Sequence, residues 1–451
     1  MSDAPATTAY WCELAWLGGD AASSDVAIDV AGDRITAVTV GGPCPPGAVR
    51  LDGLTLPGLA NAHSHAFHRA LRGRTHAGSG SFWTWREQMY ALAAVLDPDS
   101  YHRLARATFA EMVLAGFTAV GEFHYLHHGP DGAPYVDANA MGDAVAAAAH
   151  EAGIRITLLD TCYLHAGTDA DGGGRPPEGV QRRFADGTVD SWRDRVDAIR
   201  ERHAADDRLR IGAAIHSVRA CSPTEIAGIA AWADAAGMPL HAHVSEQPAE
   251  NDACLAAYGR TPTALLDDAG ALGDRFTAVH ATHVTDDDID RLVRSGSTVC
   301  LCPTTERDLA DGIGPASRLG RLAIGSDSHA VIDPFEDARA IELDERLATN
   351  VRGNNAVSRL LGAAVGGHAS LGWLEGGRIA VGAPADLVTV SLDSVRLAGT
   401  RQHDALASVL FAATAADVRR VIVGGRAVVC DGTHTSLDVA AELRAALAGL
   451  P

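Results

Sequence analysis

Lysine is absent from this sequence: all 37 basic residues among its 451 residues are arginine. The chain therefore offers no lysine amine for a Schiff base and no lysine that could be carboxylated to bridge two metal ions. Runs of basic residues are also missing, and the formal net charge is −20 at pH 7. A strongly acidic chain without basic clusters is not expected to bind nucleic acid or an anionic membrane surface.

Long apolar runs are missing as well. No stretch reaches the roughly 18 apolar residues of a transmembrane helix. The first ten residues, MSDAPATTAY, lack the basic and apolar regions of a signal peptide. The eight cysteines are scattered without a CxxC pair, which favours reduced cysteines in a cytoplasmic protein over a structural zinc site.

Three common enzyme motifs are not found. No GxGxxG or GxxxxGK[ST] follows an apolar strand, which disfavours a doubly wound nucleotide-binding sheet. No GxSxG follows a strand, so a serine hydrolase has no support. The doubly wound sheet nevertheless stays the alternative fold.

The sequence does contain a long middle segment, residues 57–370, in which short apolar strands alternate with amphipathic helices. This alternation predicts parallel βαβ units. Eight such units imply an α/β fold with a closed (β/α)8 TIM-like barrel. The eight strand candidates are LTLPGLA, FTAVGEF, RITLLD, RIGAAI, MPLHAH, FTAVHA, STVCLC and LAIGS.

The two ends of the chain have a different pattern, with short strands broken by glycine turns. Residues 1–56 contain DVAIDVAGDRITAVTV, and residues 371–451 contain VRRVIVGGRAVVCDG. We expect these N- and C-terminal segments to pair into one small β-sandwich domain beside the barrel domain.

Titratable side chains stand where four of the strand candidates end. The first strand runs into His63 and His65, and residues two apart on a strand face the same side. His243 ends the fifth strand, His280 the sixth and Asp327 the eighth. Because active sites of such barrels lie at the C-terminal ends of the strands, these residues predict a metal-dependent catalytic site.

Neighbouring residues compete for these roles. Glu246 follows His243 by three residues, as a proton shuttle beside a metal would, and this spacing favours His243 over His241. His283 and His329 remain alternatives to His280, because spacing alone does not choose between neighbours on a loop.

With these residues in place, the sequence resembles the amidohydrolase superfamily over nearly its whole length. The HxH of the first strand, His243-x-x-Glu246, His280 and Asp327 resemble the deaminase branch that holds one zinc ion. The branch with two metal ions usually bridges them with a carboxylated lysine, which this chain lacks.

A narrower resemblance is to the formimidoylglutamate deiminase family. It is carried by PGLANAHSHAFHRALRG, SFWTWREQMY, GEFHY, HSVRA and IGSDSH. It implies hydrolysis of N-formimino-L-glutamate to N-formyl-L-glutamate and ammonia in histidine degradation, by a homodimer. It also implies substrate contacts from Arg86, Tyr125, His216 and Arg219, whereas His68 stands where that family often has glutamine.

The resulting hypothesis assigns a role to each group. One zinc ion per subunit is held by three histidines and one aspartate, namely His63, His65, His243 and Asp327. Asp327, assisted by His280, accepts a proton from water, and Glu246 passes a proton to the leaving nitrogen. His216 steadies the substrate, and the two arginines bind its carboxylates.

Two other functions stay open. The first is a related zinc aminohydrolase that acts on a nucleobase, pterin or triazine, whose pocket would need aromatic stacking and amide side chains. The second is a non-catalytic scaffold that kept the barrel but lost its metal.

Overall fold

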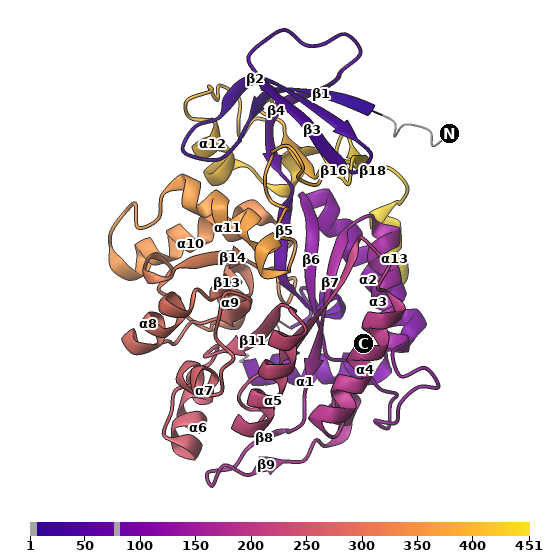
Figure 1. The fold of residues 1–451 in the computed structure, drawn as a ribbon, viewed down its shortest axis with the longest axis vertical. Helices are drawn as coiled ribbons and strands as arrows, with labels where there is room; N and C mark the ends of the chain where they lie inside the picture. The colour runs from indigo at the N-terminus through magenta and orange to yellow at the C-terminus, as the bar shows by residue number, and fades with distance from the viewer. Residues whose placement is uncertain (1–6, 76–81) are drawn as a thin grey trace.

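The computed structural model describes residues 7–75 and 82–451. The opening MSDAPA and Ser81, the first residue of the SFWTWREQMY motif, lie outside the described residues. An eight-stranded sheet stands at one end of the molecule and a helix-covered barrel forms the rest (Figure 1). No helix of the described residues is long and apolar enough to cross a membrane.

The barrel is a sheet of eight parallel strands, which confirms the predicted fold class. Their order is β14-β13-β12-β11-β10-β7-β6-β5. The barrel closes between its first and last strands: Asp327 N donates to His63 O at 3.0 Å, and His65 N donates to Asp327 O at 3.2 Å. The strands are β5 (Leu59–Ser64), β6 (Phe117–His124), β7 (Arg155–Cys162), β10 (Leu209–Ile215), β11 (Leu240–Val244), β12 (Phe276–His280), β13 (Thr298–Leu301) and β14 (Arg321–Ile324).

One strand candidate needs a correction. LTLPGLA spans two strands, because β4 (Val49–Pro57) of the end sheet finishes at Pro57 and β5 begins at Leu59. Between them, Gly58 N donates to Asp386 O at 2.8 Å, and a Cβ at Gly58 would lie 2.2 Å from Thr118 Oγ1. The chain thus passes from sheet to barrel at a glycine with no room for a side chain.

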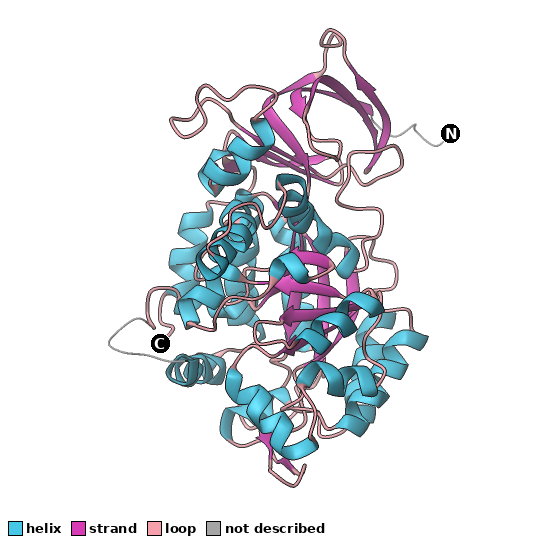
Figure 2. Cartoon of the chain, turned by 90° about the vertical axis from the view of Figure 1, so that its left-hand side faces the viewer, coloured by secondary structure: helices cyan, strands magenta, loops and turns pink. Residues whose placement is uncertain are grey.

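Helices surround the strands (Figure 2). Several begin where the sequence supplies a cap followed by proline: Asp97 accepts a hydrogen bond from Ser100 N, and Asp333 accepts one from Phe335 N. The helices are α1 (Phe82–Val95), α2 (Pro98–Ala115), α3 (Ala140–Ala152), α4 (Val189–Arg202), α5 (Pro223–Ala235), α6 (Pro248–Tyr258), α7 (Pro262–Asp268), α8 (Asp286–Ser295), α9 (Pro303–Leu309), α10 (Pro334–Thr349) and α11 (Val357–Ser370). Short 3-10 helices are η1 (Ala66–Leu71), η2 (Gly179–Phe184), η3 (Ala316–Arg318) and η4 (Ala415–Asp417), and a two-stranded ribbon joins β8 (Gly167–Thr168) to β9 (Gly174–Arg175).

The two ends of the chain meet in the second sheet, as the sequence predicts. Its strands are β1 (Thr7–Ala15), β2 (Ser23–Ala31), β3 (Arg34–Val40), β4 (Val49–Pro57), β15 (Leu387–Val390), β16 (Val418–Val423), β17 (Arg426–Cys430) and β18 (Thr433–His434). β4 joins the halves by pairing antiparallel with β15. The sheet curls on itself, because Ile35 N of β3 donates to Ala383 O, just before β15.

The C-terminal segment also holds two helices that its β-rich pattern does not predict. They are α12 (Ala405–Ala412) and α13 (Val439–Leu447). α13 lies against α2 of the barrel, where Glu442 pairs with Arg106. The end of the chain therefore stabilises the barrel as well as the sheet.

Candidate active site

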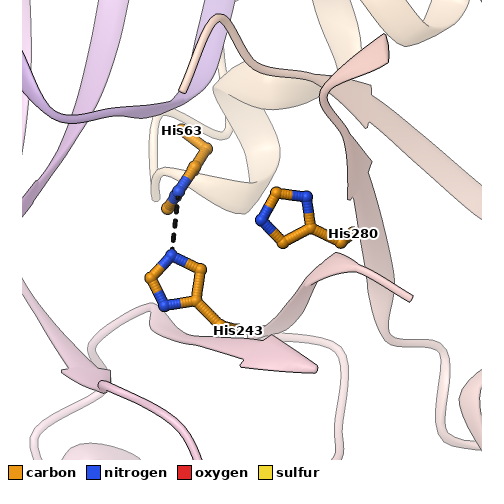
Figure 3. A group of neighbouring side chains, drawn as sticks. All are labelled: His63, His243 and His280. Atoms are coloured by element: carbon orange, nitrogen blue, oxygen red, sulfur yellow. Dashed lines mark hydrogen bonds between the residues drawn. The ribbon is translucent and has the colours of Figure 1, made fainter. Parts of the chain in front are cut away.

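Histidines from three strands converge at the C-terminal end of the barrel. His63 comes from β5, His243 from β11 and His280 from the last position of β12, and all three point toward one another (Figure 3). The Nε2 atoms of His63 and His243 lie 3.2 Å apart. The possible ligand atoms of these three residues all lie within 4.8 Å of one another.

A second group shares His63 and completes the cluster. Asp327, three residues beyond β14, places Oδ1 3.4 Å from Nε2 of His63 and 3.4 Å from Nε2 of His65. The structure therefore brings all four predicted metal ligands together, with His280 beside them.

Backbone carbonyls fix the orientation of two of these rings. Nδ1 of His65 donates to Phe123 O at 2.9 Å, and Nδ1 of His243 donates to His216 O at 2.9 Å. A carbonyl can only accept, so each ring carries its proton on Nδ1 and turns the Nε2 lone pair toward the cluster. Burial and neighbouring histidines lower the pKa of both rings well below the usual value.

Unusual backbone conformations occur where the strands end. His280 has φ 70° and Asp327 has φ 40°, both in the left-handed region. Neither is a glycine, so the surrounding structure must hold these torsion angles, as often happens at functional sites.

Two carboxylates flank His280. Oε1 of Glu246 lies 3.8 Å from its Nε2, and Oε1 of Glu306 lies 3.3 Å from its Nδ1. Burial raises the pKa of Glu246 to about 7. Burial alone would lower the pKa of His280, but the carboxylates of Glu246 and Glu306, together with Asp327, raise it well above its usual value.

A cavity opens beside the cluster. All five residues predicted to contact substrate line it, namely His68, Arg86, Tyr125, His216 and Arg219. The candidate catalytic and metal-binding residues on the same cavity are His65, His243, Glu246, His280 and Asp327. The cavity thus joins the proton-transfer groups to the basic side chains.

The predicted contact residues have well-defined neighbours. Nε2 of His68 lies 2.8 Å from the hydroxyl of Tyr125. Burial lowers the pKa of His68 to about 3, so the ring is neutral and can exchange hydrogen bonds as a glutamine would.

The two arginines differ in their surroundings. Nε of Arg219 lies 3.6 Å from Oε2 of the buried Glu250. The guanidinium of Arg86 lies 4.7 Å from the ring centroid of Trp83 and 5.3 Å from that of Tyr90.

The structure also separates the competing histidines. Nε2 of His241 donates to Ser370 O at 2.9 Å, and Nε2 of His283 donates to Asp311 O at 2.7 Å, so both rings are engaged away from the cluster. His329 lies between Ser326 Oγ, at 2.9 Å, and Ser64 Oγ, at 3.3 Å. None of these three histidines lines the cavity among the described residues.

The histidines that follow the second barrel strand lie outside the cavity too. His127 donates to Thr161 O at 2.9 Å, and His128 lies 3.1 Å from Asp186. With His124 they form a buried polar cluster away from the candidate metal ligands.

Sequence reasoning missed two buried carboxylates. Glu306 lies in the CPTTE stretch that follows β13. Its position shortly after a strand end was the sequence signal that could have identified it. Glu122 lies within GEFHY and accepts hydrogen bonds from Ser64 Oγ at 2.6 Å and Ala66 N at 2.7 Å. Burial raises its pKa to about 8, and its contacts brace the chain on both sides of His65.

Comparison with known proteins agrees with this geometry. The model of the amidohydrolase family matches residues 54–428. The chain belongs to this family. It is 39% identical over 411 residues to the formimidoylglutamate deiminase of Pseudomonas aeruginosa, covering 88% of this chain and 89% of that relative. The resemblance seen in the sequence is thereby confirmed.

Two further comparisons show that proteins with other names resemble this chain. The chain is 30% identical over 404 residues to the 5-methylthioadenosine/S-adenosylhomocysteine deaminase of Natronomonas pharaonis, covering 87% of this chain and 85% of that relative. The crystal structure of an amidohydrolase from Brucella melitensis superposes with a TM-score of 0.91 and 32% identity, covering 98% of this chain and 99% of that one.

Proposed function

We propose that this amidohydrolase is zinc-dependent and hydrolyses N-formimino-L-glutamate to N-formyl-L-glutamate and ammonia, a step of histidine degradation. The observation that carries the proposal is one cavity that joins three of the four candidate metal ligands to Arg86 and Arg219. The substrate combines an amidine with two carboxylates, and arginine binds carboxylates through a planar, bidentate fork. The similarity to the deiminase of P. aeruginosa supports the same assignment.

The residues present fit one divalent metal ion. His63, His65, His243 and Asp327 would hold it, and metal ligands must be deprotonated. Burial lowers the pKa of His63, and although burial alone would raise the pKa of Asp327, the neighbouring His63 lowers it to about 2. Zinc, when bound there, would lower the pKa of a water molecule and so supply a nucleophile near neutral pH.

The chain's own residues then move the protons. Asp327 is the proposed acceptor of the proton from the attacking water, and its Oδ2 lies 3.9 Å from Nε2 of His280, which assists it. Glu246 is the proposed donor to the nitrogen that leaves as ammonia. Its pKa of about 7 lets it hold or release a proton near neutral pH.

The remaining cavity residues orient the substrate. His216, with its ring 4.7 Å from that of Tyr163, is proposed to steady the formimino group. His68 and Tyr125 are hydrogen-bonded to each other, and both contribute polar groups to the cavity wall. Arg86 and Arg219 are the proposed carboxylate partners.

Ammonia release by the purified, zinc-loaded protein tests the proposal. N-formimino-L-glutamate is the main substrate, with N-formimino-L-aspartate, guanine and 5′-methylthioadenosine run alongside. Release from the glutamate compound alone is the expected result. Release only from a purine, or from none of the compounds at full zinc occupancy, would overturn the substrate assignment.

A purine deaminase is the second candidate function. The aromatic side chains of Trp85, Tyr125 and Phe184 line the cavity and favour stacking on a flat ring. However, no asparagine or glutamine lines the cavity among the described residues, whereas two arginines do. This lining favours a dicarboxylate over a purine.

We also propose that the protein acts as a cytoplasmic homodimer. Trp83 on α1 is 45% exposed and is a candidate contact between subunits. Sedimentation equilibrium should give about twice the 46.8 kDa of one chain, and Trp83→Ala should shift the protein toward monomer. A wild-type monomer at micromolar concentration would contradict the proposal.

A further inference from the structure

Two tyrosines and a glutamine form a polar cluster on the cavity, outside the candidate metal ligands. Tyr90 belongs to α1 and Tyr163 follows β7, and both line the cavity. Gln181 lies in η2, is 8% exposed, and contacts both tyrosines without lining the cavity.

A backbone hydrogen bond fixes the orientation of the Gln181 amide. Its Oε1 accepts a hydrogen bond from Glu178 N at 3.3 Å, and a backbone N–H can only donate. The Nε2 end therefore faces the tyrosines. It donates one hydrogen to the Tyr90 hydroxyl oxygen at 3.1 Å and one to the Tyr163 hydroxyl oxygen at 3.0 Å.

This arrangement determines what the two hydroxyls can do. A phenol oxygen that accepts a hydrogen bond from Gln181 keeps its own hydrogen for another acceptor. No described residue accepts a hydrogen bond from either hydroxyl. Both groups line the cavity, so a bound molecule is the available acceptor.

The charges around the cluster favour an anion as that acceptor. The guanidinium of Arg86 lies 5.3 Å from the ring centroid of Tyr90, and Arg219 lines the same cavity. Burial raises the pKa of Tyr163, and neighbouring Tyr90 adds to the effect, so this hydroxyl keeps its proton. Two hydroxyl donors near two guanidinium groups match the oxygens of a carboxylate.

We propose that Gln181 orients the Tyr90 and Tyr163 hydroxyls as paired donors to the substrate carboxylate that lies farther from the formimino group. Together with Arg86 and Arg219 they form a carboxylate subsite of the cavity. Gln181 is a positioning residue, because it acts only through the tyrosines. The identity of the substrate rests on the proposed function, but the subsite itself can be tested with a simple dicarboxylate.

Calorimetric binding of glutarate and butyrate measures the subsite without turnover. A hydrogen bond to a charged group is worth about tenfold or more in affinity. Wild-type protein should bind glutarate more tightly than butyrate. Tyr90→Phe and Tyr163→Phe should each weaken glutarate binding by about tenfold. The double variant should weaken it further and reduce the preference for glutarate, because Arg86 and Arg219 remain.

Substitutions at Gln181 separate orientation from packing. Gln181→Met removes the donor and lets the hydroxyls rotate. In Gln181→Glu the new carboxylate accepts both hydroxyl hydrogens. The hydroxyl oxygens then turn their lone pairs toward the ligand, and the variant adds a negative charge near it. Glutarate affinity should therefore fall in the order wild type, Gln181→Met, Gln181→Glu, whereas a packing role would make the glutamate variant at least as good as the methionine one.

Tyr135→Phe is the matched control, because the Tyr135 hydroxyl accepts from Arg183 and the residue does not line the cavity. It should leave glutarate binding unchanged. Steady-state kinetics with N-formimino-L-glutamate should show a KM about tenfold higher in each cavity tyrosine variant, with kcat within about twofold of wild type.

The two proposals fail in different ways. Unchanged glutarate affinity and KM in folded Tyr90→Phe and Tyr163→Phe variants, or no glutarate binding by wild type, would overturn the subsite. Glutarate binding that depends on the tyrosines, without ammonia release from the formimino compound, would overturn the proposed function and keep the subsite.

Discussion

Glu246→Gln should abolish most turnover and leave the metal site intact. Glu246 is 6% exposed, and its carboxylate lies 3.8 Å from Nε2 of His280. None of the three possible metal-ligand groups among the described residues includes it. Glutamine keeps the size and polarity of the side chain but cannot carry the proton.

The size of the effect follows from the proposed role. A positioned acid or base contributes about 10²–10⁴-fold to a rate, which is about 3–5 kcal/mol of transition-state stabilisation. We therefore expect kcat to fall by at least about a hundredfold, with zinc content near one ion per chain.

The pH dependence gives an independent check. Burial raises the pKa of Glu246 to about 7, so the protonated, donating form decreases about tenfold per pH unit above that value. Wild-type kcat should decline above about pH 7, and the residual rate of Glu246→Gln should lack this decline.

Metal analysis and ammonia release on the same preparations decide the outcome. Glu345→Gln is the control, because Glu345 is also a buried carboxylate but binds Ser317 and Asn355 away from the cavity. It should keep wild-type kcat. A fully zinc-loaded Glu246→Gln enzyme with wild-type kcat would refute the shuttle role, and loss of zinc from it would refute its separation from the metal ligands.

Arg219→Met should raise KM for N-formimino-L-glutamate by about 10- to 100-fold with little change in kcat, and an unchanged KM would remove Arg219 from the substrate pocket. Glu306→Gln should lower kcat by about tenfold, because Glu306 lies 3.3 Å from Nδ1 of His280, and full activity would show that His280 needs no such partner. Asp417 tests stability: burial alone would raise its pKa, but Arg396 lowers it to about 2, below the unfolded value. Its contribution is therefore present above about pH 4 and lost as pH falls toward 2, so Asp417→Asn should cost about 1–2 kcal/mol in urea unfolding at pH 7 and progressively less on acidification; a constant difference would contradict this.

The sequence alone determined the architecture and predicted where the candidate site lies. Period and length of the apolar segments located the eight barrel strands, although the first candidate also included the end of β4. Parallel strands buried on both faces need continuous apolar runs. Residues at the ends of such strands must meet at one face of a closed barrel. His63, His65, His243 and Asp327 could therefore be grouped although up to 264 positions separate them.

The tertiary structure decided which neighbouring side chain faces the cavity. His280 and Asp327 turn toward the cluster at positive φ, which no sequence pattern signals for residues other than glycine. His283 and His329 are instead engaged by Asp311 O and by serine hydroxyls. Spacing could not separate them, because side-chain direction on a loop depends on backbone torsion angles.

Contacts between distant segments were beyond sequence reasoning for a related reason. Gln181 lies 91 positions from Tyr90, and Glu306 lies 26 positions from His280. In the sequence, nothing distinguishes either residue from one at an ordinary surface or loop position. Only the closed barrel places these groups within hydrogen-bond distance, because closure sets which loops share one rim.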